Sequence, residues 1–458
     1  MCSNRLTGYI RIASTAVYLC MLLPGMGSAQ EISRPPSPDV VLLEEVTLPK
    51  DATVTELAPA TDTDFVEAAP ATEPISQEQE ESITPSDVDS SVAKTVNASN
   101  SVNQSAEYKR FHTLIEEITD QPELWYTQRR AAESGLATSD NGYHQSGALY
   151  GLSIATLLFN DRKFLDTAIA LSIDYISKGE DLDSDGYNDW YWGHDNDFHR
   201  LNHDHYEWRA AMGIAYVATT LVQLESQTQD DVNNLAIIKN YLQKHVWEKW
   251  SIPNNPAGRS NIQTSGSEYI SRLSVTALAL YQMTNEPQYR EFLTKRSSLL
   301  IDMLELNYNK STDSVFLSNR IDGTTGSATS SALDLAHSND IVNWLTYAYR
   351  IGENLGGRLE EKHLIQLKNT VTNVIYTTDE FSTYTDGTGA KNTHLSNNHA
   401  GWTFLAAFDE NLRERWIRRA LTHETTTTSK TGGVGYENRL MYFTNLVAAM
   451  SWSFENAK

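Results

Sequence analysis

The sequence predicts an all-α domain of repeated helix pairs, an (α/α)5-6 toroid or incomplete barrel of helix hairpins. Two observations carry this prediction. From residue 106 to residue 458, apolar residues recur at helical spacing. Amphipathic helices with a charged face also alternate with apolar helices that are rich in Ala, Gly and aromatic residues. One such pair recurs about every 60 residues, which is a period typical of stacked helix hairpins.

The amphipathic stretches are predicted to form an outer ring, because each has a charged face for solvent and an apolar face for the interior. They are Tyr108–Ile118, Lys163–Ser177, Val232–Trp250, Tyr289–Leu306, Leu359–Ile375 and Leu412–Leu421. The second kind of helix carries few charges, so we expect it to be buried on most sides as an inner ring. These helices follow Tyr143, Asn202, Ser267, His337, Asn397 and Tyr436.

Each predicted inner helix begins with a cluster of polar residues. The clusters are Tyr143–Ser146, Asn202–Tyr206, Ser267–Tyr269, His337–Asp340, Asn397–His399 and Tyr436–Arg439. Asn, Ser and Asp are common at helix starts because their side chains cap free backbone N–H groups. Capping explains one residue per cluster and leaves the added His, Tyr, Arg and Trp unexplained. We therefore interpret the clusters as converging on one cavity at a common rim, with ordinary capping as the alternative.

Two segments precede the predicted helical domain, and the first is typical of a secretory signal peptide. Residues 1–29 combine a basic start at Arg5 and Arg11, an apolar core over Ile12–Leu23 and small residues at Gly27–Ala29. The apolar core is shorter than the roughly 20 residues that span a bilayer. We expect an exported protein, periplasmic or extracellular, with no transmembrane segment in the mature chain. A membrane anchor retained at the N-terminus is the alternative.

Residues 30–105 are predicted to be a disordered acidic linker. They are rich in Pro, Ser, Thr and Ala, and carry 15 acidic against three basic residues. This composition buries too little apolar surface to offset chain entropy, although an acidic interaction tail is an alternative. Residues 106–458, the predicted toroid catalytic domain, have a net charge of −13, which argues against general nucleic-acid binding. Both cysteines, Cys2 and Cys20, lie in the predicted signal, so no disulfide or thiol nucleophile is expected.

Residues 181–189 match the first nine positions of a calcium-binding loop. The predicted ligands are Asp181, Asp183, Asp185, Tyr187 and Asp189. Gly186 supplies the sharp turn, while Trp192 stands where a bidentate Glu is expected, and Asp195 or Asp197 is the substitute. We predict a structural Ca²⁺ ion and no organic cofactor, with an ordinary Asp/Gly-rich turn as the alternative.

The polar clusters favour one type of chemistry. The sequence contains no Ser-His-Asp order, phosphate-binding glycine loop or His-Glu-x-x-His zinc motif. The recurring residues Asn, His, Tyr and Arg suit β-elimination from a uronic acid sugar. Asn, His or Arg stabilises the charge that develops on the carboxylate. His or Tyr removes the C5 proton, and Tyr protonates the leaving glycosidic oxygen.

One of these clusters resembles a known family. Residues Asn397–Trp402 look like the Asn-Asn-His-x-x-Trp element of the alginate-lyase-type polysaccharide lyases, which are α/α toroids. Residues Asn438–Tyr442 are similar to the Arg-x-x-Tyr-like stretch of that family. The resemblance covers roughly residues 395–445, and Gly401 stands where the family has an aromatic residue.

The resemblance implies roles for particular residues. Asn398 and His399 would act at the uronate carboxylate and C5, and Tyr442 would serve as base and acid, with Tyr436 in reserve. The dense cluster Asn202–Arg209 adds two candidate catalytic residues, His205 and Tyr206. The candidate substrate-binding residues are Asn202, His203, Arg209, His337, Asn339, Trp192 and Arg439.

Three of these assignments have structural alternatives. His399 would act at the sugar, or it would be a capping or core histidine. Arg209 would pair with a uronate, or with Glu207 or Asp204. Trp192, with Trp190 and Tyr191, would stack on sugar rings or pack the rim.

The predicted function is that of an exported polysaccharide lyase, with a uronic-acid-containing polysaccharide as its partner. A glycoside hydrolase on the same scaffold is one alternative, because Glu207, Asp340 and Glu437 offer carboxyl groups at inner-helix starts. A non-catalytic, calcium-stabilised glycan-binding protein is another.

Overall fold

A computed structural model describes residues 105–120, 139–190, 204–251, 266–321, 331–378, 380–392, 397–426 and 436–456. All of them belong to one unit of the chain, Ser82–Lys458. The predicted signal and, apart from Ser105, the predicted linker lie outside these residues. No helix among those described is long and apolar enough to cross a bilayer.

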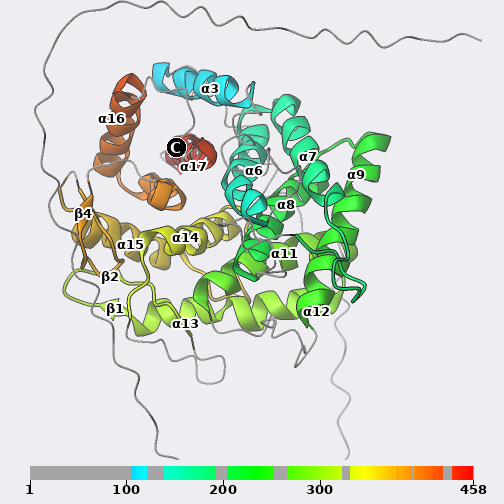
Figure 1. The fold of residues 1–458 in the computed structure, drawn as a ribbon. Coiled ribbons are helices and arrows are strands. Elements are labelled where there is room, and N and C mark those ends of the chain that lie inside the picture. The colour runs from blue at the N-terminus through cyan, green and yellow to red at the C-terminus, as the bar shows by residue number, and fades with distance from the viewer. Residues whose placement is uncertain are drawn as a thin grey trace, which may run out of the picture. The chain divides into compact units, whose positions relative to one another are not determined.

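Six helices of the described chain contact one another in a closed cycle and form the inner ring (Figure 1). They are α6 (Ser139–Phe159), α8 (Asp204–Gln223), α11 (Ser267–Thr284), α14 (Leu335–Arg350), the 3₁₀ helix η5 (Asn397–Phe408) and α17 (Tyr436–Asn456). Each contacts the next in chain order, and α17 returns to α6. The predicted α/α toroid is therefore confirmed, at the upper end of the predicted range of repeats.

Outer helices pack against the ring and connect its members (Figure 1). They are α3 (Ala106–Thr119), α7 (Arg162–Ser177), α9 (Gln229–Asn240), the π-helix η2 (Tyr241–Glu248), α10 (Lys249–Ser251), α12 (Pro287–Glu291), the π-helix η3 (Phe292–Ser297), α13 (Leu299–Leu306), α15 (Glu361–Thr370), the π-helix η4 (Val371–Ile375) and α16 (Glu410–Thr426). Two short antiparallel hairpins lie in the connections: β1 (Tyr308–Asn309) with β2 (Ser314–Val315), and β3 (Phe381–Ser382) with β4 (Lys391–Asn392).

The two rings differ in burial, as their charge patterns predict. Outer helix α3 buries one stripe of residues that includes Phe111, Ile115 and Ile118. Inner helix α8 buries every residue from Glu207 to Leu221. An inner helix is covered by two ring neighbours and an outer helix, so it has no face left for solvent-exposed charges.

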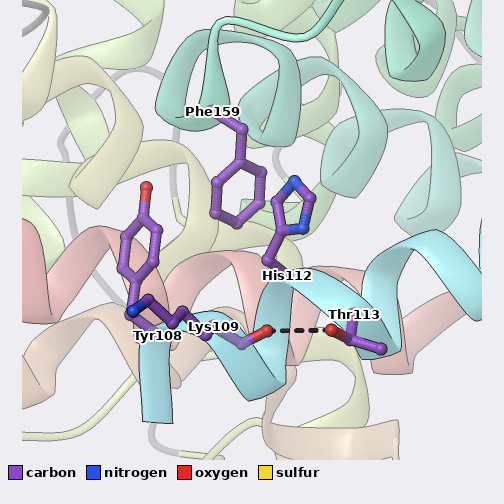
Figure 2. A pocket seen from close by; sticks show the side chains of 5 residues that line it. All are labelled: Tyr108, Lys109, His112, Thr113 and Phe159. Atoms are coloured by element: carbon purple, nitrogen blue, oxygen red, sulfur yellow. Dashed lines mark hydrogen bonds between the residues drawn. The ribbon is translucent and has the colours of Figure 1, made fainter. Parts of the chain in front are cut away.

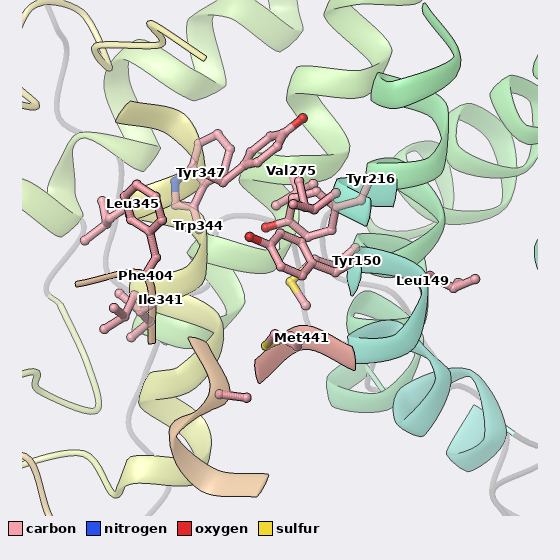
Figure 3. Packing of buried hydrophobic residues seen from close by; sticks show 14 of the residues in the cluster. Leu149, Tyr150, Tyr216, Val275, Ile341, Trp344, Leu345, Tyr347, Phe404 and Met441 are labelled. Atoms are coloured by element: carbon pink, nitrogen blue, oxygen red, sulfur yellow. The ribbon is translucent and has the colours of Figure 1, made fainter. Parts of the chain in front are cut away.

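The interior of the ring is filled by a tyrosine cluster with hydrogen-bonded hydroxyl groups (Figure 3). Tyr216 meets Tyr150 and Tyr347 edge to face, with ring centroids 4.7 and 4.9 Å apart. Tyr150 donates to Asn445 at 2.5 Å, and Asn445 donates to Asn343 at 3.1 Å. Asn343 belongs to α14 and Asn445 to α17, which are not ring neighbours, so the network crosses the interior. Satisfied buried polar networks of this kind hold the surrounding helices in one arrangement.

Candidate functional site

The first two turns of α8, α11 and α14 bring five ionisable side chains together, which we call the rim cluster: His205, Glu268, Arg272, His337 and Asp340. Buried Arg272 is central. Its Nε donates to Asp340 Oδ2 at 2.8 Å, and its Nη1 donates to the His205 carbonyl at 3.1 Å and lies 3.0 Å from His205 Nδ1. Glu268, one helical turn before Arg272, lies 3.3 Å from His205 Nδ1 and 3.9 Å from His337 Nε2.

Aromatic rings surround His205 within this cluster. The Tyr143 ring stacks on His205 at 5.1 Å and contacts Tyr206 at 4.8 Å. The Tyr269 ring meets His205 edge to face at 5.9 Å. The Arg209 guanidinium lies 4.1 Å over the Tyr143 ring and 3.2 Å from Asp340 Oδ2. Arg209 thus pairs with Asp340, a partner that the sequence analysis did not consider for it.

The two histidines have pKa values that shift in opposite directions. Burial lowers the pKa of His205 to about 4, and the positive charge of Arg272 adds to the effect. The hydrogen bond between His337 Nδ1 and Asp334, at 2.6 Å, raises the pKa of His337 despite partial burial. The two rings are 5.5 Å apart. At neutral pH this arrangement favours a neutral imidazole at His205, able to accept a proton, beside a His337 that holds a proton more readily.

Arginine engages both carboxylates of the rim cluster. Burial alone would raise the pKa of Glu268, but Arg272 and the neighbouring histidines lower it to about 2. Asp340 is fully buried and faces Arg272 and Arg209. An inverting hydrolase needs a carboxyl group that still holds a proton. The lowered pKa makes Glu268 unsuited to the role of that general acid.

The other carboxyl groups considered for a hydrolase do not join this cluster. Glu207 bonds to Lys249 and to Trp250 Nε1 instead. The side chain of Glu437 lies outside the described part of the structure.

His399 and Tyr442, singled out by the lyase resemblance, lie in a separate buried cluster. The His399 ring stacks on Phe381 at 4.1 Å, and Phe381 stacks on Tyr376 at 4.2 Å. The Tyr442 hydroxyl donates to the backbone carbonyl of Trp416 on outer helix α16, and burial raises its pKa far above the usual range. The two rings meet edge to face at 6.1 Å. The resemblance motifs thus do come together, but in a packing arrangement in which the Tyr442 hydroxyl faces an outer helix.

Asn339 also has packing contacts instead of a position open to substrate. It is buried, and its Oδ1 accepts a hydrogen bond from the backbone N–H of Gly401 on η5. A Cβ atom at position 401 would collide with the backbone oxygen of Asn339. Close packing of η5 on α14 therefore leaves no room for a side chain at position 401.

The remaining candidate residues are only partly described. Arg439 is partly buried near the start of α17. Asn202, His203 and Trp192 lie outside the described residues, as does the side chain of Asn398. The candidate calcium substitutes Asp195 and Asp197 lie outside them too.

The predicted calcium loop forms a turn with part of a ligand set. Asp181 accepts hydrogen bonds from the backbone N–H groups of Asp185 and Gly186, at 3.0 and 2.9 Å. Carboxylate oxygens of Asp181, Asp183 and Asp189 lie within 4.8 Å of one another. One oxygen of Asp189, however, accepts a hydrogen bond from Lys249 at 2.9 Å. Asp181 and Asp189 therefore already share their carboxylate oxygens with donors of the protein itself.

Trp190, which follows this loop, is packed in the core. Its ring stacks on Tyr175 with centroids 5.0 Å apart, and its Nε1 donates to the Tyr175 carbonyl at 3.2 Å. Trp190 therefore packs inside the protein, which is one of the two alternatives given for the aromatic residues 190–192. Tyr191 lies outside the described residues.

Two more groups of described residues bring possible metal ligands within 4.8 Å of one another. One is His205, Glu268 and His337, where the guanidinium of Arg272 beside His205 opposes a further cation. The other is His112, Glu116 and Asp161. It adjoins a pocket of about 400 Å³ beside α3, lined by Tyr108, Lys109, His112, Thr113 and Phe159 (Figure 2). No residue of the rim cluster lines this pocket.

Sequence reasoning placed Glu268 in a polar cluster at the expected rim without giving it a role, and it missed Arg272. Both lie in α11, which is otherwise apolar, one helical turn apart. Charged side chains at i and i+4 in a helix buried on most sides are costly unless they are paired. That spacing was the signal that could have identified them.

The fold and the rim cluster together define an α/α toroid protein with a group of buried and half-buried ionisable side chains near the starts of its inner helices. No family model and no curated protein matches the chain. Among solved structures, it is similar to the cellobiose 2-epimerase from Bacillus thermoamylovorans B4167. The TM-score is 0.41 and the identity 13%, over 70% of this chain and 90% of that chain.

Proposed function

We propose that the chain is a carbohydrate-active enzyme that moves protons on and off a sugar carbon, with His205 as general base and His337 as general acid. One observation carries the proposal: two imidazole rings 5.5 Å apart whose surroundings shift their pKa values in opposite directions. The aromatic rings beside His205 support a sugar as substrate, because tyrosine offers both an apolar ring face and a hydroxyl group.

Within this class, we propose β-elimination from a uronate polysaccharide as the first candidate reaction. His205 takes the C5 proton, the C4–O bond breaks as the C4–C5 double bond forms, and His337 gives its proton to the leaving oxygen. Negative charge develops on the uronate carboxylate during this step and needs donors nearby. Support comes from the His, Tyr and Arg residues of the rim, which are the residue types that this reaction needs.

The charge balance of the rim favours a second candidate, proton exchange at a carbon next to the carbonyl of a neutral sugar. The negative groups are Asp334, Glu268 and Asp340, and the positive groups are Arg209, Arg272 and protonated His337. These six charges of the described rim cancel, so together they give no net attraction for a uronate carboxylate. In this reaction His205 removes the proton and His337 returns one to the same carbon, which epimerises it.

One experiment separates these candidates. The chain is incubated in D₂O with a panel of uronate polysaccharides and neutral reducing disaccharides. New ultraviolet absorbance from a C4–C5 double bond supports the lyase, and deuterium on a sugar carbon without bond cleavage supports the epimerase. New reducing ends without either would indicate a hydrolase, and no change in any sugar would favour a glycan-binding protein.

Matched variants test the residues themselves. His205→Asn and His337→Asn should each lower turnover at least a hundredfold, because general acid–base catalysis contributes about 10²–10⁴-fold. His112→Asn on outer helix α3 is the control and should keep wild-type turnover. Full activity in either rim variant would overturn the assignment.

We also propose a structural Ca²⁺ ion on the 181–189 loop and export directed by residues 1–29. The calcium proposal rests on the oxygens of Asp181, Asp183 and Asp189. The export proposal rests on the basic start, the apolar core and the small residues before Gln30.

A further inference from the structure

Lys249, the first residue of α10, is a fully buried cation that binds three groups. Its Nζ donates to the carbonyl of Asn188 at 2.9 Å, to Asp189 Oδ1 at 2.9 Å and to Glu207 Oε2 at 3.0 Å. Trp250 Nε1 donates to the same Glu207 oxygen at 3.2 Å. Asp189 and Glu207 are both buried, so these contacts are shielded from water.

The partners of Lys249 lie at both ends of one connection in the chain. Asp189 ends the turn that follows outer helix α7, where its backbone N–H donates to the Glu180 carbonyl at 2.8 Å. Glu207 belongs to the first turn of inner helix α8. Lys249 comes from a third segment, directly after η2. The ammonium group of Lys249 therefore binds one residue at each end of the connection that leads into α8.

The turn of α8 that Lys249 holds is the one that supplies the rim. His205 precedes Glu207 by two residues and Arg209 follows it by two. Glu207 points to Lys249 while His205 points to Arg272 and Glu268. A rotation or shift of this turn about Glu207 would therefore displace His205 and Arg209 together.

We propose that Lys249 is a positioning residue for the proton transfer: by holding Glu207 and Asp189, it fixes the first turn of α8 so that His205 faces Arg272 and Glu268. This inference rests on the proposed function. A buried ion pair adds little net stability compared with apolar residues of the same size, but its hydrogen bonds are directional. The contacts of His205 at 3.0–3.3 Å would not survive a displacement of about 1 Å.

The test replaces the ammonium group with an apolar end of similar length, Lys249→Met, in the full chain. The first readout is the pKa of His205 from histidine NMR, with His205→Asn to assign the signal. This pKa depends on the groups that face His205, namely Arg272, Glu268, His337 and three tyrosines. We expect it to rise from about 4 by at least one unit toward 6.5. We also expect kcat to fall at least tenfold, with a smaller change in KM.

Arg162→Met is the matched control. Arg162 Nη1 donates to the buried carboxylate of Asp231 at 2.9 Å, at the junction of α7 and α9. This variant also loses the cationic partner of a buried carboxylate, so it should lower the melting temperature. It should leave the His205 pKa and kcat unchanged, because it does not hold the first turn of α8.

Each outcome of the Lys249→Met experiment either supports or overturns the positioning role of Lys249. A folded Lys249→Met chain whose His205 pKa is the same as in wild type overturns the positioning role. If Lys249→Met does not fold, Glu207→Gln replaces it, because it keeps the side-chain shape and weakens the bond to Lys249. If the wild-type chain turns over no sugar, the proposed function fails, while the NMR result still decides whether Lys249 positions His205.

Discussion

The opposite pKa shifts at the rim predict opposite effects of two histidine substitutions on acid stability. The pKa of His205 in the folded chain is about 4, against an ordinary value of 6.5. The unfolded state therefore binds this proton more strongly, and the free energy of unfolding falls as the pH drops from about 6.5 to 4. Each pKa unit corresponds to about 1.4 kcal/mol, so His205 alone accounts for a loss of about 3 kcal/mol.

His205→Asn should remove that loss. The free energy of unfolding of this variant should therefore fall less than that of wild type over this pH range. His337 has the opposite sign, because its folded pKa is raised. Its stabilising contribution is fully present below its unfolded pKa and is lost as the pH rises through the folded pKa. His337→Asn should therefore be less stable than wild type at acid pH and decline more steeply with acidification.

Urea unfolding at several pH values between 7 and 4 measures both effects, since the midpoint and slope give the free energy of unfolding. Burial also lowers the pKa of His245 to about 4, but His245 is present in all three proteins, so the differences isolate the rim histidines. Parallel pH profiles for wild type and His205→Asn would refute the claim that His205 is neutral at the rim. The claim would also be refuted if the pH dependence of the free energy of unfolding differed from wild type in the same direction for His205→Asn and His337→Asn.

Three further predictions concern the rest of the structure. Arg272→Met removes one of the two cations that face the buried carboxylate of Asp340. It should lower the free energy of unfolding by about 3 kcal/mol, which calorimetry would detect as a fall of roughly 6 °C in melting temperature. A loss below about 1 kcal/mol would contradict the central role of Arg272. Tyr442→Phe loses only a hydrogen bond to the Trp416 carbonyl, so it should cost about 1 kcal/mol and keep its turnover; inactivity would restore the lyase-motif assignment. Added Ca²⁺ should raise the melting temperature of the wild-type chain by a few degrees but not that of Asp183→Asn. If the wild-type chain melts at the same temperature with Ca²⁺ and with a chelator, the calcium site is excluded.

The candidate site was only partly predictable from the sequence. His205, Tyr206, Arg209 and His337 were expected at the rim, and the structure brings these four together. Their actual partners were not predictable, because Arg209 meets Asp340 from a helix about 130 residues later in the chain. A one-dimensional pattern shows which residues begin a helix, but not how far each helix is rotated about its axis.

The lyase motif illustrates the same limit. Asn397–Trp402 and Asn438–Tyr442 are local patterns, and their residues do become neighbours. Yet the His399 ring stacks on Phe381, and the Tyr442 hydroxyl donates to a backbone carbonyl of α16. Shape complementarity between η5, α14 and α17 decides these orientations, since only Gly at position 401 lets η5 approach Asn339. Packing of this kind depends on the partners of each helix and is not encoded in a short motif.

The sequence by itself determined the alternation of exposed and buried helices, and hence the toroid. Burial is a property of each helix that its own composition reveals, because charged residues stay on faces that reach solvent. Only the tertiary structure decided which charges share the rim. The Arg272 network joins α8, α11 and α14 through contacts near 3 Å, and such contacts exist only once the ring has closed. The outer and inner helices could thus be predicted from the sequence, while the approach of His205 to His337 follows from their final packing.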